Sequence, residues 1–193
     1  MIRSQAGFTL IELLIVLSII SLLTVFGLIG FHNFNRGQSL KLAAQELKTN
    51  LRFAQNSALS GLTGCSDPVT SGGLFQGYQA IFTKDKTTYQ IAEKCAGGTA
   101  TPVVRSYNLP ALDLVKIAGF TPSGSAPAAS CQTAGQGVTD ENLCVTFLPV
   151  NQGVSFYSSD AAAVLVTITL RSQTSGDYQV VVTKTGDIYE KKP

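Results

Sequence analysis

The residues best suited to chemistry in this 193-residue chain are its four cysteines: Cys65, Cys95, Cys131 and Cys144. No two of them form a Cys-x-x-Cys pair, and the one histidine, His32, adjoins a long apolar run. A tetrahedral zinc site would therefore need all four distant cysteines, so two disulfides are the better interpretation. We predict that Cys65 pairs with Cys95 and Cys131 with Cys144, because each bond would tie a loop to the element beside it. Disulfides indicate a compartment outside the cytoplasm.

The single histidine also limits catalysis. A Ser-His-Asp or Cys-His site needs a histidine in the folded domain, and His32 does not lie there. No Gly-rich loop is followed by Lys-Ser or Lys-Thr, the pattern of a nucleotide-binding loop. The sequence therefore predicts a protein that is not an enzyme and has no cofactor.

One carboxylate lies inside the apolar run. From Phe8 to Phe31 the only charged residue is Glu12. A helix of this length spans about 36 Å, enough to cross a hydrocarbon core of about 30 Å with some tilt. A carboxylate costs on the order of 2.5 to 3.5 kcal/mol at the bilayer centre and less near the interface, so we expect Glu12 to have a partner.

The residues before the run form a short leader. They hold one basic residue, Arg3, and end in Gly7 directly before Phe8. A secretory signal peptide would have a small-residue cleavage site after the apolar run, where the sequence has none. The basic leader, Gly7, Phe8 and Glu12 together resemble the prepilin signal of type IV pilins and type II secretion pseudopilins.

By that resemblance, a prepilin peptidase cuts the chain after Gly7, and Phe8 becomes an N-methylated terminus. Glu12 then pairs with a terminal amine, commonly that of a neighbouring subunit. The residues support this pairing independently, because cleavage creates a cation at Phe8 and Glu12 lies one helical turn away on the same face. The resemblance also implies an inner-membrane protein with a periplasmic or extracellular domain, whose partners are other pilins or pseudopilins.

An amphipathic pattern continues the helix beyond the apolar run. Six apolar residues recur at alternating spacings of four and three: Leu40, Ala44, Leu47, Leu51, Ala54 and Ala58. No proline precedes Pro68, so we predict one helix from about Phe8 to Ser60, ended near Gly61. The stripe is shorter than three heptads, which favours packing on a sheet over a free coiled coil.

Short β-branched or aromatic runs fill the rest of the chain and predict strands. They cover 77–83, 87–93, 102–108, 112–118, 143–148, 153–157, 164–170, 178–183 and 187–189, and residues 119–142 are predicted as a surface loop. Alternation places Val164, Val166, Ile168 and Leu170 on one face, as in a half-buried antiparallel sheet.

The predicted fold is α+β and pilin-like: a long N-terminal helix, transmembrane in its first half, packed through its second half on an antiparallel β-sheet. The expected divisions are the leader 1–7, the transmembrane helix 8–31, the stalk helix 32–61 and the disulfide-containing domain 62–193.

Charge argues against a nucleic-acid partner for the domain. Residues 62–193 hold nine Lys or Arg against ten Asp or Glu, so the domain is almost neutral. Lys191 and Lys192 could contact DNA, as in the minor pilins of DNA-uptake pili by resemblance. Asp187 and Glu190 are interleaved with them, so a solvated edge strand is the better interpretation.

Two classes of function remain. The first is a minor pilin-like subunit of a type IV pilus, which polymerises through its N-terminal helix and contributes to filament assembly or to the tip. A pseudopilin of a type II secretion system is the alternative within that class. The second class is a DNA-capturing minor pilin of a competence pilus. The segments 55–61, 144–149 and 178–188 resemble minor pilins and H-type pseudopilins.

Overall fold

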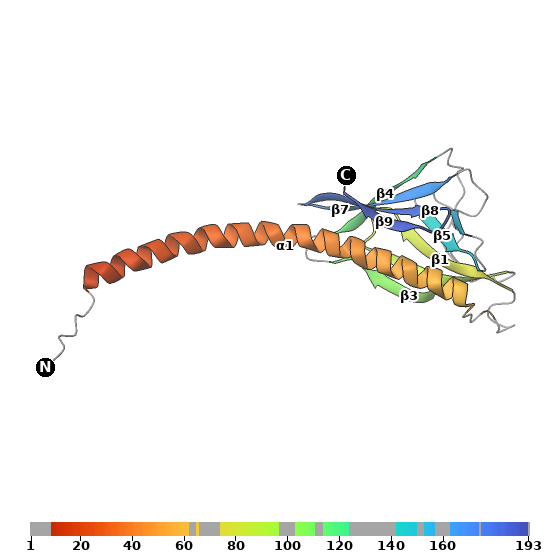
Figure 1. Ribbon diagram of the computed structural model, residues 1–193, viewed down its shortest axis with the longest axis horizontal. Helices are drawn as coiled ribbons and strands as arrows, with labels where there is room; N and C mark the ends of the chain where they lie inside the picture. Colours follow the sequence, from red (N-terminus) through yellow and green to blue (C-terminus); the bar gives the residue numbers. More distant parts are fainter. Residues whose placement is uncertain are drawn as a thin grey trace. The chain divides into compact units, whose positions relative to one another are not determined.

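The computed structural model describes residues 9–61, 65, 74–96, 103–110, 114–123, 142–149, 153–156, 163–173 and 175–192, with the side chains of 26–37, 103 and 122 excepted. The chain divides into two compact units, Met1–Gln38 and Ser39–Pro193. Helix α1, Leu10–Ser60, begins in the first unit and ends in the second (Figure 1). The prediction of one long helix is confirmed, and it ends at Gly61, whose φ of 66° suits a residue without a Cβ.

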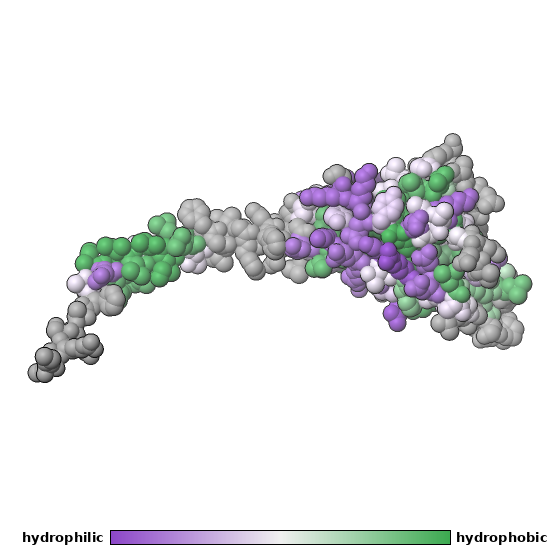
Figure 2. All heavy atoms as spheres, viewed as in Figure 1, coloured by the Kyte–Doolittle hydropathy of each residue, from purple (hydrophilic) through white to green (hydrophobic). Residues whose placement is uncertain are grey.

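The first unit exposes nearly all of its described apolar side chains. The large apolar residues between Leu10 and Val25 range from 49% to 83% exposed, and Figure 2 shows this segment as a continuous apolar surface. Over the residues whose side chains are described, no helical stretch meets the length and apolarity of a membrane span. The predicted span 8–31 includes residue 8 and side chains 26–31, which lie outside that part.

Nine strands follow the helix: β1 Phe75–Thr83, β2 Thr88–Cys95, β3 Val103–Asn108, β4 Lys116–Ser123, β5 Asn142–Phe147, β6 Val154–Phe156, β7 Leu165–Ser172, β8 Gly176–Thr183 and β9 Ile188–Lys191. They form two sheets, with orders β3-β2-β1-β5-β6 and β4-β7-β8-β9, in which every pairing is antiparallel. The sequence predicted antiparallel pairing but not the division into two sheets.

The two sheets are joined where a hairpin turn of each sheet meets a strand of the other. The Asp85 amide, in the turn between β1 and β2, donates to the Ile117 carbonyl of β4 at 2.7 Å. The Val154 amide of β6 donates to the carbonyl of Lys184, in the turn between β8 and β9, at 2.9 Å. These bonds give both sheets one continuous face for the helix to cover.

The second half of α1 covers that face. All six residues of the predicted stripe are 3% exposed or less, as is Ala43. They form one core with residues of both sheets, including Phe82, Ile91 and Phe147 from the first and Val166, Ile168 and Leu170 from the second. The packing of the helix stripe on sheets is confirmed. Val164 was predicted to share a buried face with Val166, Ile168 and Leu170. It precedes β7 and is exposed, whereas the other three are buried.

Polar contacts tie the helix to each sheet. The Asn50 amide donates to the Tyr89 hydroxyl at 2.7 Å, within a stack of Phe82, Tyr89 and Tyr107. On the other sheet, the Lys48 ammonium pairs with the Glu190 carboxylate at 2.8 Å. These bonds fix the position of the helix along its own axis, which an apolar stripe alone does only loosely.

The predicted boundaries fail around β4. Residues 112–118 were predicted as a strand, but Leu114 has a φ of 45° and the strand runs from Lys116 to Ser123, so residues 119–123 are not loop. Proline at 122 is tolerated because β4 is an edge strand, where the missing N–H leaves no ladder bond unmade. The rest of the predicted loop, up to residue 141, lies outside the described residues.

Gly77 is required by close packing within the first sheet. It lies at a register shift between β1 and β2, with a φ of 138°. A Cβ at this position would collide with the carbonyl oxygen of Phe147 on β5. Glycine therefore permits the bulge that lets β1 pair with strands on both sides.

Candidate functional site

A reciprocal pair of contacts begins helix α1. The Glu12 amide donates to the Thr9 hydroxyl at 3.3 Å, while the Glu12 carboxylate accepts from the Thr9 hydroxyl at 3.4 Å and from its amide at 3.5 Å. This is a capping box, in which two residues satisfy amides that the first helical turn leaves without partners. Glu12 also places its negative charge near the positive end of the helix dipole.

The capping box changes the interpretation of Glu12. Its charge was predicted to have a partner, by resemblance a terminal amine and commonly that of a neighbouring subunit, and within the single chain Thr9 is bonded to it. That contact was missed, although the spacing Thr-x-x-Glu before an apolar run is its known sequence pattern. Gly7 and Phe8, the predicted processing residues, lie outside the described residues.

The surroundings of Glu12 are apolar and exposed. Leu10, Ile11, Leu13 and Leu14 are each more than half exposed. A carboxylate set in such a surface has a single local partner and is accessible to a cation from another chain. In an apolar environment an ion pair to an amine would be far stronger than in water.

The disulfide of Cys65 and Cys95 lies at the end of β2. Its Cα atoms are 5.8 Å apart, and the bond joins residues 30 positions apart in the sequence. This is the first of the two pairings predicted from the sequence. Cys144, in the middle of β5, is also disulfide-bonded, and its predicted partner Cys131 lies outside the described residues.

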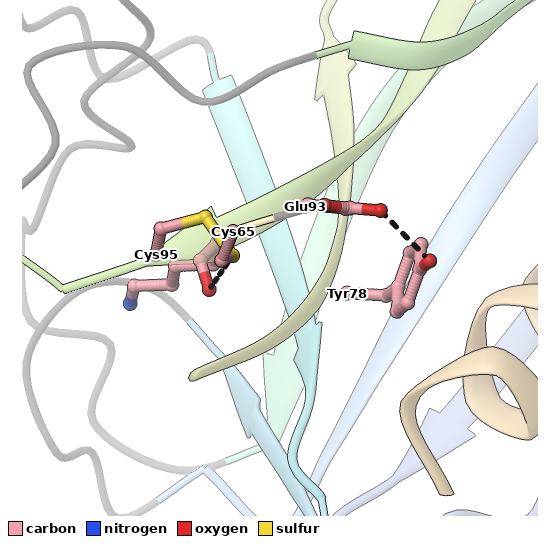
Figure 3. The surroundings of a disulfide bond; sticks show 5 residues. Cys65, Tyr78, Glu93 and Cys95 are labelled. Atoms are coloured by element: carbon pink, nitrogen blue, oxygen red, sulfur yellow. Dashed lines mark hydrogen bonds between the residues drawn. A yellow bond between two sulfur atoms is a disulfide. The ribbon is translucent and has the colours of Figure 1, made fainter. Parts of the chain in front are cut away.

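A buried carboxylate adjoins this disulfide. Glu93 lies two residues before Cys95 on β2, so the two side chains point to the same face, and Glu93 is only 8% exposed. The Tyr78 hydroxyl, directly opposite on β1, donates to it at 3.0 Å (Figure 3). Burial, and then the nearby Glu93, raise the pKa of Tyr78 to about 12, so the hydroxyl stays protonated and donates. Sequence reasoning missed this pair.

The basic residues near the C-terminus form no concentrated patch. Glu190 is engaged by Lys48, and the Tyr178 hydroxyl lies 3.4 Å from its other oxygen. Lys184, Lys191 and Lys192 are exposed, on either side of Asp187. β9 is thus an edge strand with mixed charge, as the sequence indicated.

The N-terminal sequence matches a known family model. The family is described as the prokaryotic N-terminal methylation motif, and it matches residues 2–28. The matched stretch contains Gly7, Phe8 and the capping box, so the motif and the start of the helix coincide. The N-terminal segment of the chain therefore carries a prokaryotic N-terminal methylation motif.

Among solved structures, the chain is similar to the type IV minor pilin FimU of Pseudomonas aeruginosa strain PAO1. The sequence identity is 14% and the TM-score is 0.42. The match covers 79% of this chain and 93% of the other.

Proposed function

We propose that this chain is a minor pilin-like subunit of a type IV pilus. In this proposal a prepilin peptidase cuts after Gly7, and Phe8 carries the new, methylated amine. The helix then anchors the subunit in the inner membrane until it enters a filament, with the disulfide-containing domain outside the cytoplasm. The observation that supports this best is a carboxylate at the start of a helix whose apolar side chains from Leu10 to Val25 are exposed among the described residues.

The exposed helix keeps the subunit in an apolar environment, either lipid or a filament. Side chains such as Leu13 and Ile20 are 56% and 54% exposed, and burying apolar surface yields about 25 cal/mol per Å². Such a surface is stable in lipid or against the same surface of other subunits. Transfer from the membrane to a filament exchanges one apolar environment for another. The free energy of burying apolar surface therefore does not fix the stagger between the helices of neighbouring subunits.

In this proposal Glu12 fixes the stagger between the helices of neighbouring subunits. Within one chain its carboxylate accepts from the Thr9 amide and hydroxyl, at 3.5 and 3.4 Å, and both contacts are long for a charged acceptor. A methylated amine from a neighbouring subunit offers a full positive charge instead. Pairing with that amine is favourable in only one stagger of the helices, and this selects the correct neighbour.

Intact-mass measurement of the protein extracted from membranes tests the proposal. We expect a chain that begins at Phe8 and carries one added methyl group. Retention of Met1 in a strain with a working prepilin peptidase would contradict the proposal, as would cleavage after Phe31. Replacing Gly7 with a bulky residue should leave the full-length, unmethylated precursor in the membrane.

Sheared surface filaments distinguish the pilus from its alternatives. We expect the protein in such filaments together with other pilins. Its presence only in cells that carry a type II secretion system, with secretion lost on deletion, would favour the pseudopilin. Salt-dependent DNA binding by the purified chain would favour the competence pilus.

A further inference from the structure

The disulfide and Glu93 form a compact, buried cluster. The sulfur atoms of Cys65 and Cys95 and a carboxylate oxygen of Glu93 all lie within 4.8 Å of one another. The three residues are 4%, 9% and 8% exposed, respectively. Within the described part of the chain, this is the one group of three side chains whose ligand atoms lie close enough to hold a metal ion.

The carboxylate is poorly explained by packing alone. On β2, Tyr89 and Ile91 share a face with Glu93 and belong to the apolar core. Burying a carboxylate at the end of such a row is costly unless it is paired, and an apolar residue would pack there without that cost. The Tyr78 hydroxyl donates to the Glu93 carboxylate, and Figure 3 shows the Glu93 side chain extending toward Tyr78, with the disulfide on its other side.

We infer that reduction of the Cys65–Cys95 disulfide converts this cluster into a binding site for a thiophilic divalent cation, of which Zn²⁺ is the best match. Two thiolates and one carboxylate provide three ligands, and water completes a tetrahedron. Zinc bonds of about 2.3 Å to sulfur and 2.0 to 2.2 Å to oxygen place ligand atoms roughly 3.4 to 3.8 Å apart. The carboxylate oxygen lies within 4.8 Å of both sulfurs, so a small movement of the side chains brings the ligand atoms to that spacing once the S–S bond is broken.

The oxidised and metal-bound states exclude one another. A dithiol donates two electrons and two protons, which break the S–S bond and yield two thiols, while the dithiol itself becomes a disulfide. The cation then displaces the two thiol protons to solvent and forms two metal–sulfur bonds and one metal–oxygen bond. Binding should therefore strengthen as pH rises through the range where thiols ionise.

Tyr78 acts as a positioning residue in this site. Its hydroxyl donates to Glu93, as partners outside the coordination sphere commonly orient metal-binding carboxylates. Loss of such a partner lowers metal affinity by about 10- to 100-fold. Tyr78→Phe removes the donor and leaves all three ligands in place.

Cobalt titration of the full chain in detergent tests the proposal. The protein is reduced with a water-soluble phosphine, freed of reductant without oxygen, and titrated with Co²⁺. Cys131→Ala and Cys144→Ala together remove the other two thiols. In that background we expect one Co²⁺ per chain, with a thiolate-to-cobalt charge-transfer band and the visible bands of tetrahedral cobalt. The unreduced protein should show neither.

The variants identify the ligands. We expect Cys95→Ala to abolish the charge-transfer band and Glu93→Gln to weaken binding at least about tenfold, with Tyr78→Phe in the range given above. Affinity unchanged by Glu93→Gln would overturn the proposal, as would octahedral cobalt spectra in the reduced protein.

A measurement on the unaltered chain does not depend on whether the variants fold. X-ray absorption of the reduced chain loaded with one Zn²⁺ should show two sulfur ligands with oxygen in the remaining positions. Four sulfur ligands would mean that all four cysteines bind the metal. A spectrum without sulfur ligands would mean that the metal binds elsewhere in the protein. Either result rejects the site.

Discussion

Helix α1 contains two leucines with opposite surroundings. Leu14, in the first unit, is 57% exposed, whereas Leu51, in the second, is fully buried. Helix propensity is the same for both, so the difference comes from what surrounds each half. The second half is covered by the sheets of its own chain. The first half has no cover within the described residues, and its apolar side chains need lipid or other subunits.

Charged residues show the same contrast. Glu12 finds its partner three residues away, within its own helical turn. Lys48 pairs with Glu190, 142 residues later in the sequence. The first unit thus carries local contacts that another chain can replace, and the second carries contacts that define its own fold.

The largest expected effect is on filament assembly. Glu12→Leu should insert into the membrane at least as well as the unaltered chain, because a costly charge is removed. It should enter filaments poorly, because the amine of its neighbour loses its partner. The amount in sheared filaments, divided by the amount in membranes, measures this. We expect at least a tenfold decrease, and an unchanged ratio would refute the role of Glu12.

Thr9→Val separates assembly from helix capping. It removes the capping hydroxyl at a cost of about 1 kcal/mol to the helix end but leaves the carboxylate in place. The filament fraction should then stay near that of the unaltered chain. A loss as severe as that of Glu12→Leu would show that the cap itself is what assembly needs.

A matched pair of leucine substitutions tests the two surroundings directly. Leu51→Ala should destabilise the domain by about 2 to 5 kcal/mol, because it leaves a cavity between the helix and the sheets. Leu14→Ala should change the unfolding free energy of the domain by less than about 0.5 kcal/mol. Urea unfolding of the full chain in detergent, followed by near-ultraviolet circular dichroism of the tyrosines, measures both. Equal effects would mean that the halves are not independent.

Removing the Cys65–Cys95 bond should have a comparable effect on the domain. For a separation of 30 residues, the chain-entropy model gives about 3.5 kcal/mol. Replacing both cysteines with alanine avoids leaving a lone thiol. The same urea experiment measures the loss, and full stability without the bond would indicate that neighbouring contacts already fix both ends. Filament entry per folded subunit should not change.

The smallest expected effect is a pH dependence beside the turn between β7 and β8, the two inner strands of the second sheet. Arg171 binds both Asp177 oxygens, at 2.7 and 2.8 Å, and this contact holds the pKa of Asp177 below its ordinary value. Because the folded pKa is depressed, the pair stabilises the domain above about pH 4, and the contribution disappears as pH falls through the folded pKa. Asp177→Asn should cost less than about 1 kcal/mol at pH 7, since the pair is largely solvated.

Measurement at two pH values checks that sign. The difference in unfolding free energy between Asp177→Asn and the unaltered chain should shrink toward zero near pH 2. Arg171→Gln should show a similar loss at pH 7. A difference that grew on acidification would mean that the carboxyl is destabilising in the folded domain.

Much of the fold could be predicted because its signals are local. The helix stripe from Leu40 to Ala58 follows the 3.6-residue period, and hairpins such as the one at Lys84–Lys86 lie between alternating runs. The division into two sheets could not be predicted, since it depends on backbone bonds such as the one from the Asp85 turn to Ile117 of β4, which are distant in the sequence. The start of β4 was misplaced because Leu114 has a turn conformation that its side chain does not indicate.

The candidate site could be predicted only where its signals, like those of the fold, are local in the sequence. Glu12 stands out as one charge in an apolar run, whereas its contact with Thr9 is a local pattern that was overlooked. The pairing of Tyr78 with Glu93 depends on the register between β1 and β2, which no short motif encodes. Residues that share a strand were easier to place than residues brought together by pairing.

The ion pair between Lys48 and Glu190 can form only late in synthesis, because its partners lie far apart in the sequence. Synthesis at about 5 to 20 residues per second separates these partners by roughly 7 to 28 s. Through that interval the stripe of α1 lacks β9 and the Gly186 turn, whose carbonyl accepts from Gln55 at 3.0 Å. The helix is synthesised well before β9, with which it packs. Folding of the domain is therefore completed only after β9 has been synthesised.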